Sequence, residues 1–407
     1  IPWTLYILAV VTMITAGLIG LNQTRTHARP WLTFKTASVL LAQSVPLMIV
    51  LFLLFPRLPP LWTVPMPSQV ARSGVSDEVS PGDIANLAAS SDLAFKATFK
   101  GDPPPTTQLY WRGLTLPDFD GRAWKQSALM FRSAWQNDAE KPDWVDAVAR
   151  IGGRFSYSII LEPTQQRWLF ALTMPDLPKD PDVVMLQDYR LARIEPVSAK
   201  FRYEVNSDLT FDVTDELTQF WRYRYTLLPD DGSNPRSRAL AQEMFAASSD
   251  RADYIGRVLR RYRDQGFAYS LRPSALGSDA IDAFMFDTRR GFCEHFASSF
   301  AFMMRAAGIP ARLVVGYQGG EYNPVADYIA VFQYDAHAWT EVWMEGEGWV
   351  RVDPVTAVAP ERIERGLEAA IQSEQTFLAG SPLSALSRQM LWLVEIRLQL
   401  SAINYYW

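Results

Sequence analysis

The sequence predicts an α+β protein preceded by two transmembrane helices, and three features of its 407 residues indicate this architecture. Two stretches near the start of the chain are apolar and carry no charge. Strand-like runs separated by turn residues follow, and after them a block of helices precedes a block of strands. Hydrophobic residues make up 48% and charged residues 20% of the chain, a composition that can bury a large core.

Residues 1–56 are predicted to form two transmembrane helices with a short loop, 22–35, between them. Ile1–Leu21 and Thr36–Phe55 carry no charge and are each about as long as the 20 residues that cross a bilayer. The loop is basic and contains no acid; its cations are Arg25, Arg29 and Lys35. By the positive-inside rule this loop is cytoplasmic. We therefore expect a multi-pass protein of the inner, cytoplasmic membrane, with the rest of this chain on the extracytoplasmic, periplasmic side.

The next two regions are a predicted linker, 57–92, and a predicted β domain, 93–230. The first is rich in Pro, Ser and Gly. The second contains runs such as LAFKATFK, QLYWRGLTL and RFSYSIILEP, which are typical of antiparallel strands. LPDFDGRAW adds an Asp-Gly turn between aromatic stretches, a hairpin signal. We find no recognisable chemistry in this domain.

Residues 231–360 are predicted to be a separate α+β core. Asn234 followed by Pro235 starts one helix and Asp250 caps a second. A third helix is expected from Cys293 to Ala307, followed by the strand-like runs ARLVVGY, DYIAVFQ, HAWTEVWM and GWVRVDP. Residues 361–407 read as a helical segment that leads to a further membrane span.

Composition excludes several classes of function. The net charge is −5 and no Lys/Arg-rich run could follow a phosphate backbone, so we expect no nucleic-acid partner. A single cysteine rules out an internal disulfide and a cysteine-based zinc site, and three histidines leave little material for a metal site. We predict no metal or organic cofactor; the expected partners are the lipid bilayer and the substrates, and the oligomeric state is left open.

Cys293, the only cysteine, is the candidate nucleophile. It follows Gly291 at the expected start of a helix, where the helix dipole favours a thiolate. A lone cysteine is commonly a small buried apolar residue, so the prediction depends on finding a base for it. Of the other candidates, His27 lies in the cytoplasmic loop and His295 points away from Cys293 on the same helix. His337, 44 residues downstream, is the base that can reach it.

Asp353 is the candidate acceptor for the second nitrogen of His337. The turn residues 346–348 predict a hairpin of HAWTEVWM with WVRVD. If Asp353 pairs opposite Trp339, it lies on the same face as His337 and within reach of its ring. A loop of even length without a bulge would place Asp353 on the other face, so the sequence leaves this register open.

These residues resemble the transglutaminase-like superfamily. GFCEHFASSFAFMMRAAGIPARLVVGY is similar to its nucleophile segment, HAWTEVW to its histidine segment and GWVRVDPV to its aspartate segment. With the two spans and the β domain, most of the chain resembles the bacterial membrane-anchored transglutaminases of the TgpA type. The resemblance implies a papain-like core, a Cys293-His337-Asp353 triad, and acyl transfer from a protein glutamine to an amine through a thioester. One departure is Val355, where threonine is commoner in the superfamily.

Two residues are weaker candidates for the oxyanion site or the substrate-binding wall. The Tyr269 hydroxyl can take the place of the tryptophan donor of animal relatives, and Trp339 can line a substrate channel; core packing explains both equally well. The same triad can also hydrolyse amides, so a cysteine peptidase or amidase of envelope peptides is the alternative function. A scaffold without activity is a third reading, against which the intact triad argues.

Overall fold

The computed structural model describes residues 35, 39, 78–80, 83–127, 142–214 and 216–367. The chain divides into two compact units, 1–69 and 70–407, and the description below concerns the second. The two predicted membrane spans and most of the predicted C-terminal helical segment lie outside the described residues. Among the residues that are described, no helix is long and apolar enough to cross a membrane.

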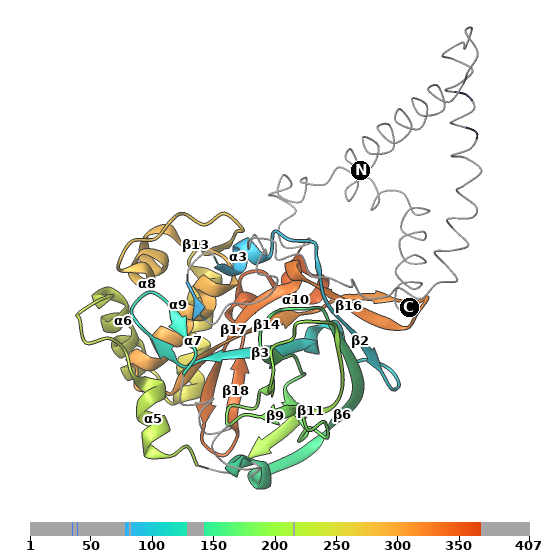
Figure 1. Cartoon of the computed structure of the whole chain (residues 1–407). Coiled ribbons are helices and arrows are strands. Elements are labelled where there is room, and N and C mark those ends of the chain that lie inside the picture. Colours follow the sequence, from blue (N-terminus) through green and yellow to red (C-terminus); the bar gives the residue numbers. More distant parts are fainter. Residues whose placement is uncertain are drawn as a thin grey trace. The chain divides into compact units, whose positions relative to one another are not determined.

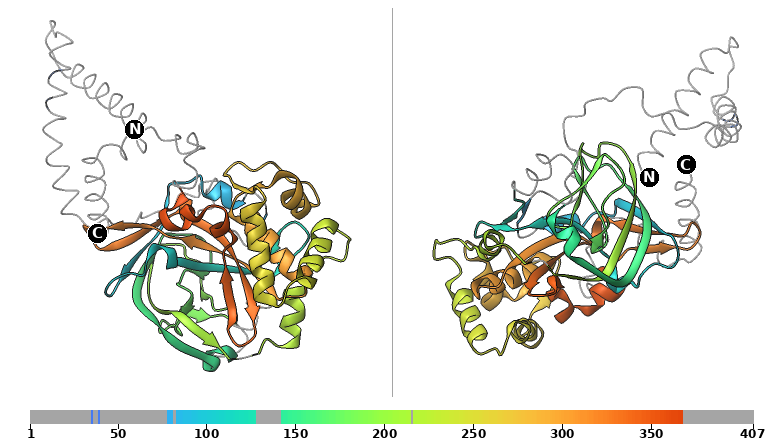
Figure 2. Two further views of the ribbon diagram at one scale, coloured as in Figure 1. Left: turned by 180° about the vertical axis from the view of Figure 1, so that it is seen from behind. Right: turned by 90° about the horizontal axis from the view of Figure 1, so that it is seen from below.

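Helices and strands occupy different sides of the described unit, so the predicted α+β class is confirmed for this part of the chain. Figure 1 shows the helices α5–α9 gathered on one side and the long strands β6 and β11 on the other, and both views of Figure 2 show the same separation. The helices on that side are α5 (Gln219–Thr226), α6 (Pro235–Ala246), α7 (Arg251–Asp264), α8 (Ala280–Asp282) and α9 (Cys293–Ala306).

A six-stranded antiparallel sheet contains strands from both of the predicted domains. Its order is β15-β16-β2-β6-β11-β8. Its strands are β2 (Leu93–Phe99), β6 (Val148–Leu161), β8 (Met174–Pro175), β11 (Phe201–Val213), β15 (Glu321–Asn323) and β16 (Tyr328–Phe332).

A four-stranded antiparallel sheet, in the order β18-β17-β14-β3, also joins the two predicted domains. Its strands are β3 (Tyr110–Leu116), β14 (Ala311–Gln318), β17 (Ala336–Met344) and β18 (Gly348–Val352). The boundary predicted near residue 230 therefore does not separate two sets of strands. Strand β3 pairs with β14 and β2 pairs with β16, and each partner lies about two hundred residues later in the chain. Alternating patterns identify strands but do not identify distant pairing partners.

The remaining described elements are short. Three small sheets pair β1 (Glu78–Val79), β5 (Trp124–Lys125) and β4 (Asp118–Phe119); β7 (Trp168–Leu169), β10 (Leu191–Arg193) and β9 (Val183–Met185); and β12 (Ala268–Tyr269) with β13 (Arg290–Gly291). The short helices are α3 (Asp83–Leu87), α10 (Pro360–Arg365), η1 (Thr106–Gln108), η2 (Asp143–Ala147), η3 (Ala283–Thr288), η4 (Gln333–Asp335) and η5 (Pro354–Ala357).

Helix α9 lies at the centre of the core and fixes the start of β17. Nearly all of its side chains are buried, as the apolar pattern of its sequence requires. The Thr340 hydroxyl donates to the carbonyl oxygen of Ala297 at 2.8 Å, which ties β17 to the helix. On the other side of β14, Gly316 allows β3 to approach, because a Cβ there would lie 1.9 Å from the carbonyl oxygen of Trp111. These two contacts bring α9, β17 and β3 together at one place.

Candidate active site

Cys293 is the first residue of α9 and is fully buried. His295, two residues further along the helix, folds back toward the helix start, where its Nδ1 accepts a hydrogen bond from the backbone N–H of Phe292 at 3.3 Å. That nitrogen therefore satisfies one of the free N–H groups of the helix start. The His295 ring is occupied as a cap and is not available as a base for Cys293.

His337 and Asp353 lie within hydrogen-bonding distance of each other. Strand β18 pairs with β17 so that Thr340 faces Val352, and one further step places Asp353 opposite Trp339. This is the register, of the two that the sequence allowed, that puts Asp353 on the face of His337. The distance between His337 Nε2 and Asp353 Oδ2 is 2.7 Å, and both side chains are buried.

Asp353 is held by three donors. Its Oδ2 accepts from His337 and, at 2.8 Å, from the Tyr110 hydroxyl, while its Oδ1 accepts from the N–H of Val355 at 3.0 Å. Burial disfavours the charged carboxylate, but the nearby His337 and these hydrogen bonds keep the pKa of Asp353 below its usual value. Burial also lowers the pKa of His337. A neutral imidazole that donates from Nε2 to a carboxylate leaves Nδ1 as the acceptor, and this Nδ1 has no partner among the described residues.

A hydrogen bond from a backbone N–H connects Cys293 to β17, the strand that carries His337. The N–H of Ala338, the residue after His337, hydrogen-bonds to the sulfur. The sequence argument expected the helix start to lower the pKa of Cys293. Instead, burial raises it well above the ordinary value, and the neighbouring Glu294 adds to the effect, while the Ala338 N–H opposes it. In this closed arrangement Cys293 is a neutral thiol.

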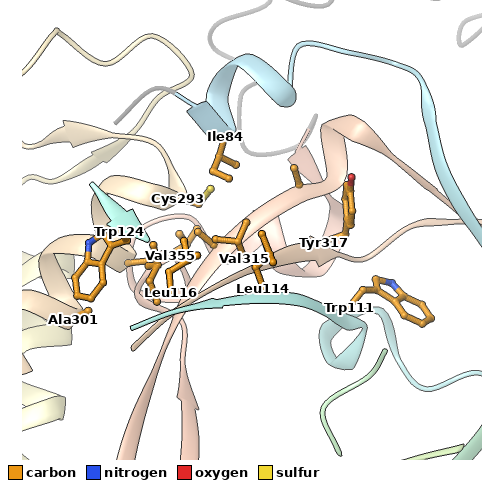
Figure 3. Close-up of a cluster of buried hydrophobic side chains, with 14 of the residues drawn as sticks. Ile84, Trp111, Leu114, Leu116, Trp124, Cys293, Ala301, Val315, Tyr317 and Val355 are labelled. Atoms are coloured by element: carbon orange, nitrogen blue, oxygen red, sulfur yellow. The ribbon is translucent and has the colours of Figure 1, made fainter. Parts of the chain in front are cut away.

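The short helix α3 covers the nucleophile. Ile84 is 2% exposed and points toward Cys293 in Figure 3. The N–H of Ile84 donates to Glu294 Oε2 at 2.7 Å, which fastens α3 to the first turn of α9. The sequence predicted a linker here. The structure instead has a short helix, whose Ile84 N–H is bound by the buried Glu294 carboxylate. The sulfur is therefore covered by Ile84 of α3 in this structure.

The two weaker candidates, Tyr269 and Trp339, lie beside Cys293 and His337, respectively. Tyr269 pairs with Gly291 through β12 and β13, and its buried hydroxyl makes no close hydrogen bond in the described part of the chain, but it interacts with the nearby Arg362 side chain. Burial raises the pKa of this phenol well above its usual range; a thiolate at Cys293 would raise it further, and Arg362 opposes the shift. The Trp339 ring is 6.4 Å from the His337 ring, centroid to centroid, and nearly parallel to it.

Two further residues of the site were not predicted from the sequence. Tyr110, on β3, donates to Asp353 from 243 positions away, and its ring packs edge-on against Trp339 at 5.3 Å. Arg362, on α10, is fully buried and acts electrostatically on both Cys293 and His337. Neither residue could be predicted from the neighbouring sequence, because each occurs in a pattern typical of an ordinary strand or helix. Among the described residues, no group of three or more His, Cys, Asp or Glu side chains could hold a metal ion.

Comparisons with known proteins identify the family of this chain. A family model described as the TgpA N-terminal domain matches residues 1–211, and one described as the transglutaminase-like superfamily matches residues 238–354. A protein-glutamine gamma-glutamyltransferase of Pseudomonas aeruginosa is 44% identical over 99% of this chain, which spans 59% of that protein's length. The uncharacterized protein YebA of Bacillus subtilis is 23% identical over 74% of the chain and is covered over 44% of its own length.

A solved structure is also similar. The crystal structure of the periplasmic domain of TgpA from Pseudomonas aeruginosa matches 73% of this chain and 99% of its own, with a TM-score of 0.68 and 43% sequence identity. The match extends over most of the described residues, so the fold of this unit agrees with an experimentally determined relative.

Proposed function

Because this chain belongs to the family described as the TgpA N-terminal domain and carries a transglutaminase-like core, we propose that it transfers the acyl group of a protein glutamine to an amine. The observation that carries the proposal is the His337-Asp353 hydrogen bond of 2.7 Å beside a single buried cysteine at a helix start. The named activity of the 44% identical relative supports the same reaction.

The first half of the reaction forms a thioester. The Cys293 thiol gives its proton to His337 Nδ1, and the sulfur attacks the carboxamide carbon of a peptide-bound glutamine. As the tetrahedral intermediate collapses, the C–N bond breaks and His337 returns the proton to the departing nitrogen, which leaves as ammonia. Asp353 holds the imidazole in the tautomer that this transfer needs and stabilises it while it is charged.

The second half transfers the acyl group to the acceptor. A primary amine gives a proton to His337 and attacks the thioester carbon, the C–S bond breaks, and the proton returns to the sulfur. The product with a lysine is an isopeptide crosslink; with water it is a glutamate. In both halves the oxyanion is stabilised by the backbone N–H of Cys293 and by the Tyr269 hydroxyl, whose lack of a close hydrogen bond supports this role, and Trp339 lines the substrate path.

We propose that this reaction takes place outside the cytoplasmic membrane. The basic loop 22–35 between two uncharged stretches supports this orientation, and the solved relative is the periplasmic domain of its protein. Protease added from the periplasmic side should cleave within residues 60–360. Protection of this region together with cleavage of the 22–35 loop would contradict the orientation.

Incorporation of a labelled primary amine into a glutamine-containing protein tests the reaction. We expect incorporation by the wild type, loss in Cys293→Ala and His337→Gln, and retention in His295→Gln, whose amide oxygen can accept the same Phe292 N–H. The last variant is a matched control, because it also removes a buried histidine. Cleavage of the peptide chain without amine incorporation would favour the peptidase alternative and overturn the proposal.

A further inference from the structure

Four buried polar atoms at the active site have no hydrogen-bond partner within the described part of the chain. They are Tyr269 Oη, His337 Nδ1, Trp339 Nε1 and Arg362 Nε. A buried polar group without a partner costs free energy, and native structures rarely keep several of them together without a reason. The proposed chemistry uses His337 and Tyr269. It gives no role to Arg362.

Arg362 is anchored by oxygen atoms that carry no full charge. Its Nη1 donates to Gln318 Oε1 at 2.9 Å, and its Nη2 donates to the carbonyl oxygens of Asp335 at 3.2 Å and Ala336 at 3.5 Å. These two carbonyls directly precede His337. No described carboxylate forms an ion pair with Arg362, so a full positive charge lies buried at the start of β17 without a matching negative charge.

A second buried arginine shows what a purely structural role looks like. Arg305, at the other end of α9, is also buried and forms no ion pair with a described carboxylate. All three of its nitrogens donate to backbone carbonyls, from Nε to Ala311, from Nη1 to Leu227 and from Nη2 to Pro117. Arg362 differs in that its Nε donates to no carbonyl and in that its side chain interacts with the Tyr269 hydroxyl and acts electrostatically on Cys293 and His337.

The charges that face Cys293 explain why a cation is needed there. Its own helix contributes Glu294 and His295, β17 contributes His337, the end of β18 contributes Asp353, and β12 contributes the Tyr269 phenol. On the covering helix α3, Asp83 is exposed and accepts from the N–H of Ser80, so it is turned to solvent. A thiolate would thus face two carboxylates, and Arg362 is the fixed cation among these groups.

We propose that Arg362 is the positioning and electrostatic residue of this active site. It holds the backbone that carries His337, and it places a permanent positive charge beside the Cys293 sulfur and the Tyr269 hydroxyl, where negative charge develops on the thiolate and then on the oxyanion. The stabilisation of the oxyanion rests on the proposed acyl transfer. The stabilisation of the thiolate does not, and it can be tested without that reaction.

Alkylation of the single cysteine by two reagents of different charge tests the proposal. Iodoacetamide is neutral and iodoacetate is anionic; in both reactions the thiolate forms the S–C bond and iodide leaves. In Arg362→Gln we expect the iodoacetamide rate at neutral pH to fall about tenfold, equivalent to a shift of about one pH unit in thiolate formation. The iodoacetate rate should fall further, so that the ratio of the two rates also decreases.

The ratio separates charge from structure, because movement of α3 and loss of stability change both rates by the same factor. Arg362→Lys keeps the charge and should keep most of the ratio. Arg305→Gln should lower the stability and leave the ratio unchanged. If Arg362→Gln and Arg305→Gln behave alike, Arg362 is only structural and the proposal is wrong. If even the wild type incorporates no amine, the acyl-transfer function fails, and the alkylation ratio still decides the role of Arg362.

Discussion

Strand β17 contributes to two buried polar clusters that differ in how their charges are paired. The active-site cluster consists of Cys293, His337, Asp353, Tyr110 and Arg362. The arginine cluster consists of Glu341, four residues after His337 on β17, and of Arg112, Arg312, Asp188 and Arg190 from other segments. In the arginine cluster each residue has an opposite charge beside it, with Arg312 Nη2 at 2.9 Å from Glu341 and Arg190 Nε at 2.6 Å from Asp188.

The comparison shows that the ion pairing of the arginines, rather than burial, distinguishes the two clusters. Both clusters are buried to the same degree. The arginine cluster joins β3, β14 and β17 through Arg112, Arg312 and Glu341, and its ion pairs offset the cost of removing charges from water. The active-site cluster contains an arginine that forms no ion pair with a described carboxylate, whereas buried polar atoms without a hydrogen-bond partner occur in both clusters, for example Arg362 Nε in the one and Arg112 Nε in the other. We infer that the first cluster stabilises the fold and the second is prepared for a ligand.

Asp353→Ala should give the largest effect and should act on activity. The variant leaves His337 free to adopt the wrong tautomer or orientation, and we expect kcat to fall by about 10³–10⁴-fold. The free energy of unfolding should fall by only about 1–3 kcal/mol, from three donors left without their acceptor. Amine incorporation and urea unfolding measure the two quantities. If Asp353→Ala instead unfolds the protein, and the fraction that remains folded keeps its kcat, Asp353 contributes to stability and not to activity. The proposed difference between the two clusters would then be wrong.

Glu341→Gln is the corresponding test of the arginine cluster. It leaves Arg112 and Arg312 buried without their shared carboxylate, and we expect the free energy of unfolding to fall by about 3–5 kcal/mol. Glu345→Gln is the control, because Glu345 pairs with Arg222 and Arg251 at the surface and should contribute less than about 1 kcal/mol. Equal losses in urea unfolding for the two variants would show that burial adds nothing to the importance of Glu341.

The sequence predicted the parts of the active-site cluster that depend on counting and periodicity. One cysteine and three histidines left few combinations, and the apolar pattern of α9 gave the helix that carries Cys293. The hairpin of β17 and β18 was predicted, but its register depends on the three residues between Met344 and Gly348, and the alternation of side chains could not decide it.

The other parts depend on contacts between distant segments. Tyr110 donates to a residue 243 positions away, and α3 lies in a stretch whose composition is typical of a linker. The pKa of Cys293 was misjudged for the same reason, because its burial is caused in part by α3. Local patterns specify faces of helices and strands, and they do not specify which remote segment covers a face.

His295, at the same helix start as Cys293, should make the free energy of unfolding depend on pH. Burial lowers its pKa in the folded state to about 4, below the 6.5 of a free histidine. At His295 the unfolded chain therefore binds a proton at a higher pH than the folded chain. The contribution of His295 to the free energy of unfolding is complete above pH 6.5 and is lost as the pH falls toward 4. The expected loss is about 3 kcal/mol. Burial raises the pKa of Asp335 to about 7, which has the opposite effect on stability, so only a difference between variants is informative.

The measurement is urea unfolding of the wild type and His295→Gln at several pH values between 7 and 4. The wild type should lose more stability than the variant over this interval, by an amount that approaches the expected loss. Parallel curves would mean that the His295 ring is protonated in the folded state, which is incompatible with its Nδ1 accepting the Phe292 N–H.

Tyr110→Phe should give the smallest effect and tests whether the upstream region takes part in catalysis. Burial raises the pKa of Tyr110 above its usual value, so the residue is a neutral phenol that donates to Asp353. Its loss leaves a more basic carboxylate, which still accepts from His337 and Val355 and should raise the pKa of the His337 imidazolium. We expect kcat to fall about fivefold, equivalent to about 1 kcal/mol, and the acidic limb of the pH–rate profile to move to higher pH, because His337 acts as a base only when it is unprotonated.

Tyr317→Phe is the matched control, since it removes a buried hydrogen bond of the same 2.8 Å length, to Gln333, that does not touch the triad. Both variants should lose a similar free energy of unfolding, about 1 kcal/mol. Only Tyr110→Phe should move the pH–rate profile, because only its hydroxyl shares an acceptor with His337. A shift of equal size in both variants would mean that the profile reports general loosening of the sheet. In that case β3 would belong with the arginine cluster, as part of the scaffold.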